Sequence, residues 1–189
     1  FQTRVERPDQ AVAAVRDALR ESVSGKPGVA QIDIPIDVST DELGTDNVPA
    51  PVRMATPHIR SFPDPGLVEK AADLLARAQR PVLLIGGGAN YSGAGDALMR
   101  LAERLGAPVV NSPTSRGVLP ESNALVLGCA GIIGYEPVGN AIREADLVLA
   151  IGSRLSDIQT SRGELLPVGA PIIQVDIDAA ALGKEYPSE

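Results

Sequence analysis

The most constraining stretch of this sequence is an apolar run that ends in three consecutive glycines, RPVLLIGGGAN at residues 80–90. Pro81 to Ile85 contains no polar residue, and such a run bounded by glycines predicts a strand buried on both faces. Gly86, Gly87 and Gly88 then let the backbone approach another group closely. Ligands of open parallel sheets bind at this carboxyl edge of the strands, although a tight strand-to-helix turn without a ligand accounts for the same residues.

The sequence after residue 63 alternates between helical and strand patterns. Continuous apolar strands separated by amphipathic helices predict an α/β fold with a doubly wound parallel sheet. Residues 112–134 have no clean period, and we expect a long functional loop there. The predicted helices are 64–78, 93–105 and 137–144, and the predicted strands are 81–85, 108–111, 146–151 and 171–175.

The first 62 residues predict an incomplete unit followed by a linker. Apolar residues at helical spacing predict a helix over Pro8 to Ser24, and alternation predicts a strand over Val29 to Ile34. The stretch after them is rich in Pro, Asp and Thr, which is typical of an extended linker. His58 lies in it and is expected to be an exposed loop residue. The predicted division is residues 1–38, a linker at 39–62, and a domain at 63–189.

Composition narrows the class of protein. The formal net charge of -7 argues against a nucleic-acid or anionic-membrane partner. Cys129 is the only cysteine, which fits a reducing cytosol, and no apolar run approaches the ~18 residues that span a membrane. We therefore expect a cytoplasmic protein that binds neither nucleic acid nor membrane. Because the sequence begins with Phe and ends in YPSE, we also expect it to be part of a longer protein.

The glycine turn departs from the dinucleotide-binding fingerprint. That pattern needs G-x-G-x-x-G leading directly into a helix and an acidic residue at the end of the second strand. Here Gly86, Gly88 and Gly93 are too widely spaced, and Asn111 and Ser112 occupy the acidic position. A standard NAD site is therefore disfavoured.

Several other segments should meet the glycine turn at the same edge of the sheet. Glycines also mark residues 128–134 and 152, and bare backbone amides at such an edge can hold a pyrophosphate. Arg154 can pair with phosphate or form a surface salt bridge. Asp176 and Asp178 can accept from a nucleotide or cap a turn. No Ser–His pair or metal-ligand cluster is present, and Cys129 is expected to be a small packing residue.

Four segments in order resemble the central domain of thiamine-diphosphate-dependent 2-oxoacid enzymes. They are RPVLLIGGGAN, SPTSRGVLPESNALVLGCAGIIG, ADLVLAIGSRLSD and IIQVDIDAAALGK, and PGVAQIDIPIDV resembles the end of the pyrimidine-binding domain. The acetolactate synthase (acetohydroxyacid synthase) branch is the most similar.

The resemblance implies a parent enzyme of three α/β domains that decarboxylates a 2-oxoacid and transfers the acyl unit. Its outer domains bind thiamine diphosphate and Mg²⁺ outside this chain, and it is a homo-oligomer through those domains. The central domain is mainly structural and binds FAD, ADP or nothing, so we expect this chain alone to be inactive. The implied cofactor-facing residues are Gly86, Gly87, Gly88, Thr114, Gly128, Cys129, Ala130, Gly131, Gly152, Ser153, Arg154, Asp176, Ile177 and Asp178.

The chain departs from the acetolactate synthase pattern at three places. Asn123 replaces a His, and Ile132 and Ile133 replace Met-His. Leu155, Ser156 and Asp157 stand in place of Phe-Asp-Asp. Glyoxylate carboligase, sulfoacetaldehyde acetyltransferase and benzoylformate decarboxylase types therefore stay open. Two other hypotheses remain: a free-standing nucleotide-binding module of the electron-transferring flavoprotein or NAD-dependent deacylase type, and a scaffold without a ligand.

Overall fold

The computed structural model describes residues 1–43 and 60–189, which fall into two compact units, Phe1–Ser61 and Phe62–Glu189. Most of the predicted linker and His58 lie outside the described residues. Among those residues no helix is both long and apolar enough to cross a membrane.

The first unit is a β-α-β arrangement. Strands β1 (Gln2–Arg4) and β2 (Gln31–Asp33) pair in parallel, and α1 (Ala11–Val23) connects them after a short 3-10 helix, η1 (Pro8–Gln10). A short helix, α2 (Ile36–Ser39), follows. The helix and second strand agree with the sequence analysis, whereas β1 is an addition. Three residues are too short to show a period, so only the pairing with β2 identifies this strand.

The second unit contains five parallel strands in the order β5-β4-β3-β6-β7. This confirms the predicted doubly wound parallel sheet. The long buried runs β3 and β6 pair along their whole length at the centre, because strands covered on both faces need apolar side chains throughout. The bounds are β3 (Pro81–Ile85), β4 (Val109–Asn111), β5 (Val126–Cys129), β6 (Leu147–Ile151) and β7 (Ile172–Val175).

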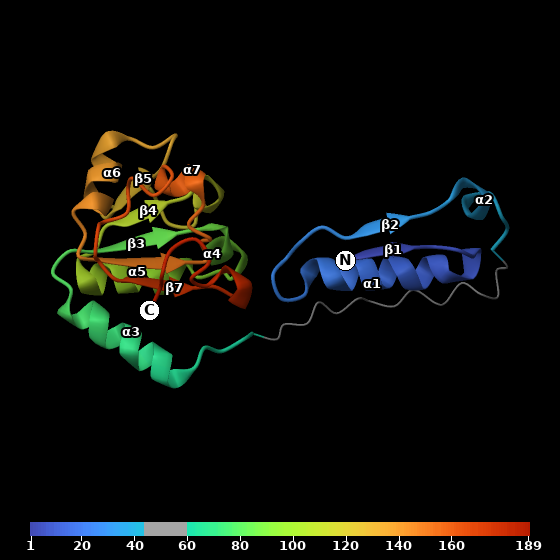
Figure 1. Ribbon diagram of the computed structural model, residues 1–189, viewed down its shortest axis with the longest axis horizontal. Coiled ribbons are helices and arrows are strands. Elements are labelled where there is room, and N and C mark those ends of the chain that lie inside the picture. Colours follow the sequence, from blue (N-terminus) through green and yellow to red (C-terminus); the bar gives the residue numbers. More distant parts are fainter. Residues whose placement is uncertain (44–59) are drawn as a thin grey trace. The chain divides into compact units, whose positions relative to one another are not determined.

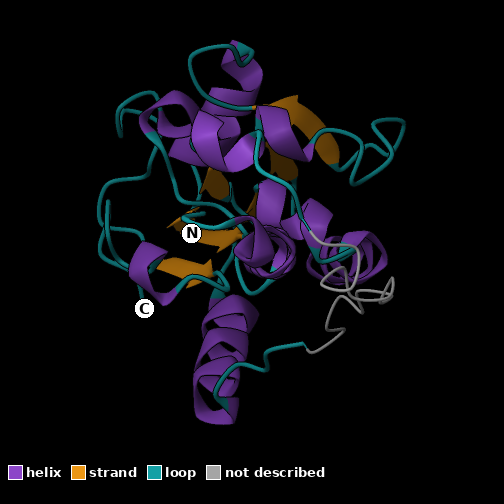
Figure 2. Cartoon of the chain, turned by 90° about the vertical axis from the view of Figure 1, so that its right-hand side faces the viewer, coloured by secondary structure: helices purple, strands orange, loops and turns teal. Residues whose placement is uncertain are grey.

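Helices cover both faces of this sheet (Figure 1 and Figure 2). Leu83 and Ile85 pack with α3 and α5 on one face, whereas Val82 and Leu84 pack with α6 on the other. Asp64 begins α3 as predicted, since its carboxylate accepts from the Gly66 and Leu67 amides. The helices are α3 (Pro65–Arg77), α4 (Gly87–Tyr91), α5 (Gly95–Leu105), α6 (Glu136–Arg143) and α7 (Asp157–Thr160), with 3-10 helices η3 (Pro113–Ser115) and η4 (Ala179–Ala181).

The expectation that residues 112–134 are irregular is wrong over Val126–Cys129, which form edge strand β5. Its pattern is hidden by a bulge, because Val109 faces Val126 whereas the next residue, Val110, faces Gly128. Gly128 has φ +104°, a conformation that side chains rarely adopt, so a glycine is needed at this break in the ladder.

At the opposite edge of the sheet, residue 189 pairs with one backbone group of β7. The Glu189 amide donates to the Ile172 carbonyl of β7 at 2.9 Å. The Glu189 carboxylate also pairs with Lys70 of α3 at 2.6 Å. Both side chains of that pair are about half exposed, so the backbone hydrogen bond is the more significant contact.

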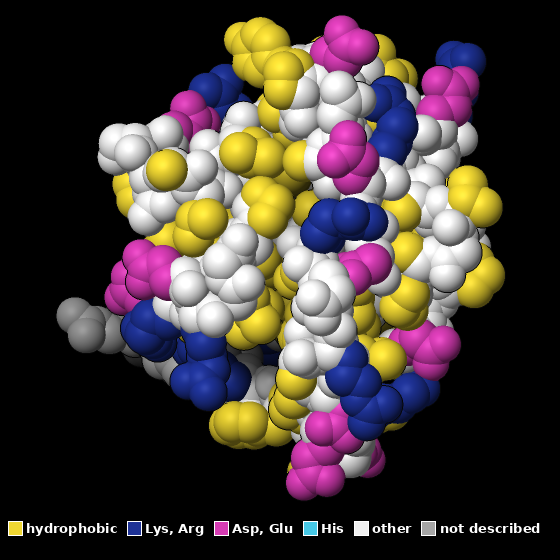
Figure 3. Space-filling view, turned by 90° about the vertical axis from the view of Figure 1, so that its left-hand side faces the viewer, with side chains coloured by type: hydrophobic (Ala, Val, Ile, Leu, Met, Phe, Trp, Pro, Cys, Tyr) yellow, Lys and Arg dark blue, Asp and Glu magenta, His cyan; other side chains and the backbone are white. Residues whose placement is uncertain are grey.

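The surface drawn in Figure 3 carries acidic and basic side chains interspersed with apolar ones. Its charges therefore do not form one large field of a single sign.

Near the start of the central strands, the Asp146 carboxylate accepts hydrogen bonds from backbone amides. It accepts from the Gln79 amide at 2.7 Å and from the Arg80 amide at 2.9 Å. These two hydrogen bonds tie the segment between α3 and β3 to the start of β6.

We predict that Asp146→Asn destabilises the chain by about 1 kcal/mol at pH 7, because the charged acceptor of two amides is lost. The Gln79 amide, then the Arg80 amide, holds the pKa of Asp146 below its ordinary value. A lowered folded-state pKa stabilises above the unfolded pKa and loses that contribution as pH falls through the folded pKa. The difference between the variant and the original chain should therefore shrink below about pH 4.

Urea unfolding at pH 7 and pH 3 measures this difference. Asp73→Asn, on the exposed side of α3, is the matched control and should be near neutral at both pH values. An Asp146→Asn effect of the same size at pH 7 and pH 3 would contradict the assigned role.

Candidate functional site

The candidate site lies where the sheet reverses its winding order. From β3 the chain continues to β4 on one side, and from β6 it continues to β7 on the other. In open α/β sheets, such a switch point leaves a crevice outside the carboxyl ends of the two strands, where ligands bind. Helices α4 and α7 follow these strand ends (Figure 1).

Two of the three predicted glycines, Gly86 and Gly88, pack directly against Gly152 at the end of β6. The Gly86 amide donates to the Ile151 carbonyl at 2.9 Å, and the Gly88 amide donates to the Gly152 carbonyl at 3.0 Å. A Cβ atom on Gly86 would overlap the Gly152 carbonyl, and one on Gly88 would lie 2.7 Å from the Gly152 Cα. The close approach inferred from the sequence is therefore made, at these positions, to another backbone segment.

Gly87 has a different environment. Its added Cβ would lie 3.1 Å from the Thr114 hydroxyl, so these two predicted residues are neighbours at the edge. The Thr114 hydroxyl is 3.0 Å from that of Ser112. Buried Ser115 donates to the Ile85 carbonyl at 2.8 Å, which fixes the segment after β4 against the end of β3. Thr114 is thus held beside the glycine turn by hydroxyl groups and not by apolar packing alone.

Residues 128–131 lie at the end of β5. Cys129 and Ala130 are buried, and desolvation raises the pKa of the Cys129 thiol. A buried thiol with a raised pKa is a poor nucleophile, which suits the predicted packing role. Gly131 leaves no room for a side chain because its Cβ would overlap the Ile158 carbonyl of α7. This segment therefore joins α7 to the edge of the sheet.

Arg154 is the exposed cation of the site. Its neighbours Ser153 and Leu155 are buried, whereas the Arg154 side chain is exposed. Within residues 1–43 and 60–189, Arg154 makes no hydrogen bond or ion pair. An exposed guanidinium without a partner in the described residues is available to pair with an external phosphate or carboxylate.

The acidic residues after β7 take part in turns. Asp176 accepts from the Asp178 amide at 2.9 Å, and Asp178 accepts from the Ala180 amide at 3.0 Å as the cap of η4. These contacts match the turn-and-cap interpretation of the two aspartates. Ile177, which lies between them, is exposed.

Asn111, which occupies the place of an acidic ribose ligand, is fully buried at the end of β4. Its side-chain amide has no hydrogen-bond partner among the described residues. This side chain therefore lies inside the domain and not on the surface of the edge.

Comparison with known proteins identifies the family of this domain. The profile described as "Thiamine pyrophosphate enzyme, central domain" matches residues 68–189. The chain belongs to this family. The resemblance seen in the four sequence segments is thereby confirmed.

Several relatives are named acetolactate synthase. A probable acetolactate synthase large subunit from Methanocaldococcus jannaschii is 36% identical over 182 residues, covering 95% of this chain and 31% of that protein. The large subunit from Corynebacterium glutamicum is 35% identical, covering 95% of this chain and 29% of that protein. The one from Lactococcus lactis is 36% identical over 90% of this chain and 29% of that protein. The chain thus spans less than a third of the length of these relatives.

A cavity of about 460 Å³ lies beside β5 in this central domain. It includes Gly128 and Cys129 of the predicted site. Arg116 and Glu121 at this cavity form a bidentate pair with two contacts of 2.9 Å. Sequence analysis did not single out these two side chains, and their spacing of five residues in a loop gave no periodic signal. The remaining lining residues are Pro113, Val126, Leu127, Ile133 and Tyr135.

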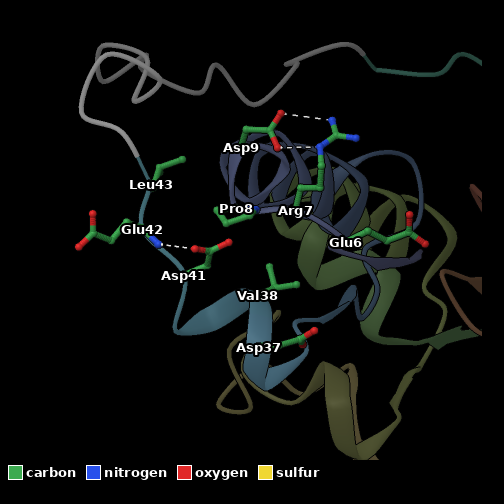
Figure 4. A pocket seen from close by; sticks show the side chains of 9 residues that line it. All are labelled: Glu6, Arg7, Pro8, Asp9, Asp37, Val38, Asp41, Glu42 and Leu43. Carbon is green, nitrogen blue, oxygen red and sulfur yellow. Dashed lines mark hydrogen bonds and ion pairs between the residues drawn. The ribbon is translucent and has the colours of Figure 1, made fainter.

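A separate cavity of about 410 Å³ occurs within residues 1–43. Five of its lining side chains are carboxylates, but Glu6 and Glu42 point away from each other (Figure 4). Asp9 already pairs with Arg7 at 3.1 Å, and this hydrogen bond lowers the pKa of Asp9. Among the described residues no group of three or more His, Cys, Asp or Glu could hold a metal ion.

The glycine contacts predict unequal effects of adding one methyl group. Gly86→Ala should destabilise by about 3 kcal/mol, because the methyl would overlap the Gly152 backbone and force two central strand ends apart. Gly87→Ala should change stability by no more than about 1 kcal/mol, since alanine favours the helix and the neighbouring atom is a threonine hydroxyl. Denaturant unfolding of both variants measures the difference, and equal effects would contradict this account of the turn.

Proposed function

We propose that this chain is the central domain of a thiamine-diphosphate-dependent enzyme of the acetolactate synthase type. The parent would decarboxylate a 2-oxoacid and transfer the acyl unit. It would be a cytoplasmic homo-oligomer in which this domain packs with the other domains of the same polypeptide. The family match over residues 68–189 and the names of the relatives support this proposal.

Within that enzyme, we propose that this domain binds FAD or ADP at the switch point. The observation that carries this is exposed Arg154, which lies beside the ends of β3 and β6 without a partner in the described residues. Gly87 and Thr114 supply a side-chain-free backbone and a hydroxyl at the same edge. Together they are suited to a pyrophosphate, which prefers a cation and short polar donors. The nucleotide would serve to fill and stiffen this edge.

The same residues do not fit thiamine diphosphate and its Mg²⁺. That coenzyme supplies the stabilised carbanion for decarboxylation in such enzymes, and its metal requires oxygen ligands. No group of metal-binding side chains occurs among the described residues. We therefore derive no catalytic step from this chain and propose that the coenzyme and Mg²⁺ bind elsewhere in the parent.

A ligand-free scaffold is the second candidate. It is favoured by the packing of Gly86 and Gly88 against Gly152 and by the use of Asp176 and Asp178 in turns. These contacts explain most of the predicted site residues without a nucleotide. They leave exposed Arg154 unexplained.

Calorimetric titration of the chain with FAD and, separately, with ADP tests these alternatives. We expect binding of at least one, and Arg154→Met should weaken it about tenfold or more, because a charge-assisted hydrogen bond contributes about 1.5–3 kcal/mol. Arg100→Met, which removes an exposed cation from α5, is the matched control and should leave the affinity unchanged. Absence of binding by both nucleotides would support the scaffold. Equal affinities for the original chain and Arg154→Met would show instead that a nucleotide binds without Arg154, which contradicts the proposed site.

A further inference from the structure

The turn that carries Arg154 has a conformation that a polypeptide does not adopt readily. Leu155 has φ +52°, in the left-handed region that disfavours residues with a Cβ atom. Its side chain is nevertheless almost completely buried. Such strained residues persist only where surrounding contacts determine them, and they occur preferentially at functional sites. The contacts that hold Leu155 are therefore informative.

A chain of hydrogen bonds connects this turn to the end of β3. The Leu155 amide donates to the Ser153 hydroxyl at 3.1 Å, and that hydroxyl donates to the Gln159 side-chain carbonyl at 2.5 Å. The Gln159 amide group points back to the Ile85 carbonyl at 3.5 Å, a long contact at the limit of a hydrogen bond. Ser153 and Gln159 are both buried, so their polar groups depend on each other.

A second glutamine holds the same turn from β7. The Gln174 side-chain amide donates to the Ser153 carbonyl at 3.0 Å, and its oxygen accepts from the Gly183 amide at 2.9 Å. The backbone and the hydroxyl of Ser153 are thus each fixed by a different glutamine. Arg154 is the one residue of the turn's Ser153–Leu155 portion whose side chain is left exposed.

We propose that Gln159 and Gln174 are positioning residues that hold the Gly152–Leu155 turn so that Arg154 faces a bound phosphate group. This inference rests on the proposed nucleotide binding and adds how the site is organised. A side chain as long as arginine loses much conformational freedom on binding, and a fixed backbone below it reduces that cost. Neither glutamine needs to touch the ligand.

A double-mutant cycle separates positioning from general destabilisation. Gln174→Met and Gln159→Leu remove the amides with little change of volume. Each should weaken ADP binding about three- to tenfold in the original chain, the equivalent of one hydrogen bond. In the Arg154→Met background they should have no further effect, because the side chain they position is gone. The same titrations are made with FAD. If Gln159→Leu does not fold, Gln174→Met alone tests the proposal, because position 174 is only half-buried.

Thr160→Val is the matched control. It removes a hydroxyl from α7 that contacts Tyr186 at 3.1 Å and donates to the Ser156 carbonyl at 3.1 Å, so its contacts lie outside the Gly152–Leu155 turn. It should lower stability but leave ADP affinity unchanged in both backgrounds. Losses of equal size with and without Arg154, or no loss in the original chain, would overturn the positioning role. If the original chain binds neither ADP nor FAD, the proposed nucleotide binding itself fails, which is a separate result.

Discussion

The second unit depends on the contact between two backbone turns at the centre of its sheet. Gly86 and Gly88 after β3 pack against Gly152 after β6. The Gly86 amide donates to the Ile151 carbonyl at 2.9 Å and the Gly88 amide to the Gly152 carbonyl at 3.0 Å, which continues the strand pairing beyond the ladder. Because no side chain separates them, backbone atoms alone fill the centre of the switch point. What remains open to the outside is the surface around Gly87 and Arg154, so the packing of the sheet itself limits where a ligand can sit.

The sequence predicted the central strands well because their burial on both faces requires continuous apolar runs, as in β3 and β6. It missed β1, whose three residues are too few to show a period, and β5, whose pattern is interrupted by the bulge at Gly128. At the site, it placed the glycines after the correct strands. It could not distinguish Gly86, which packs against backbone, from Gly87, which does not, because that difference arises only when β6 is brought beside β3.

The family assignment and the local geometry address different questions. Membership of the thiamine pyrophosphate enzymes follows from the match over residues 68–189 and says which kind of domain this is. The contacts show which of the predicted site residues maintain the fold and which have no structural role. Turns account for Asp176 and Asp178. Packing accounts for Gly131 and Cys129. Neither accounts for Arg154 among the described residues, and for that reason it carries the functional argument.

The backbone groups of the two edge strands are interrupted in different ways, and this affects how readily another strand can add to the sheet. At β5 the bulge at Gly128 breaks the regular row of backbone groups, and at β7 the Glu189 amide occupies the Ile172 carbonyl. A flat, unpaired edge is a template on which a second molecule can add its own strand and begin an aggregate. The bulge at one edge and the paired Ile172 carbonyl at the other each interrupt the row of backbone groups that an added strand would need.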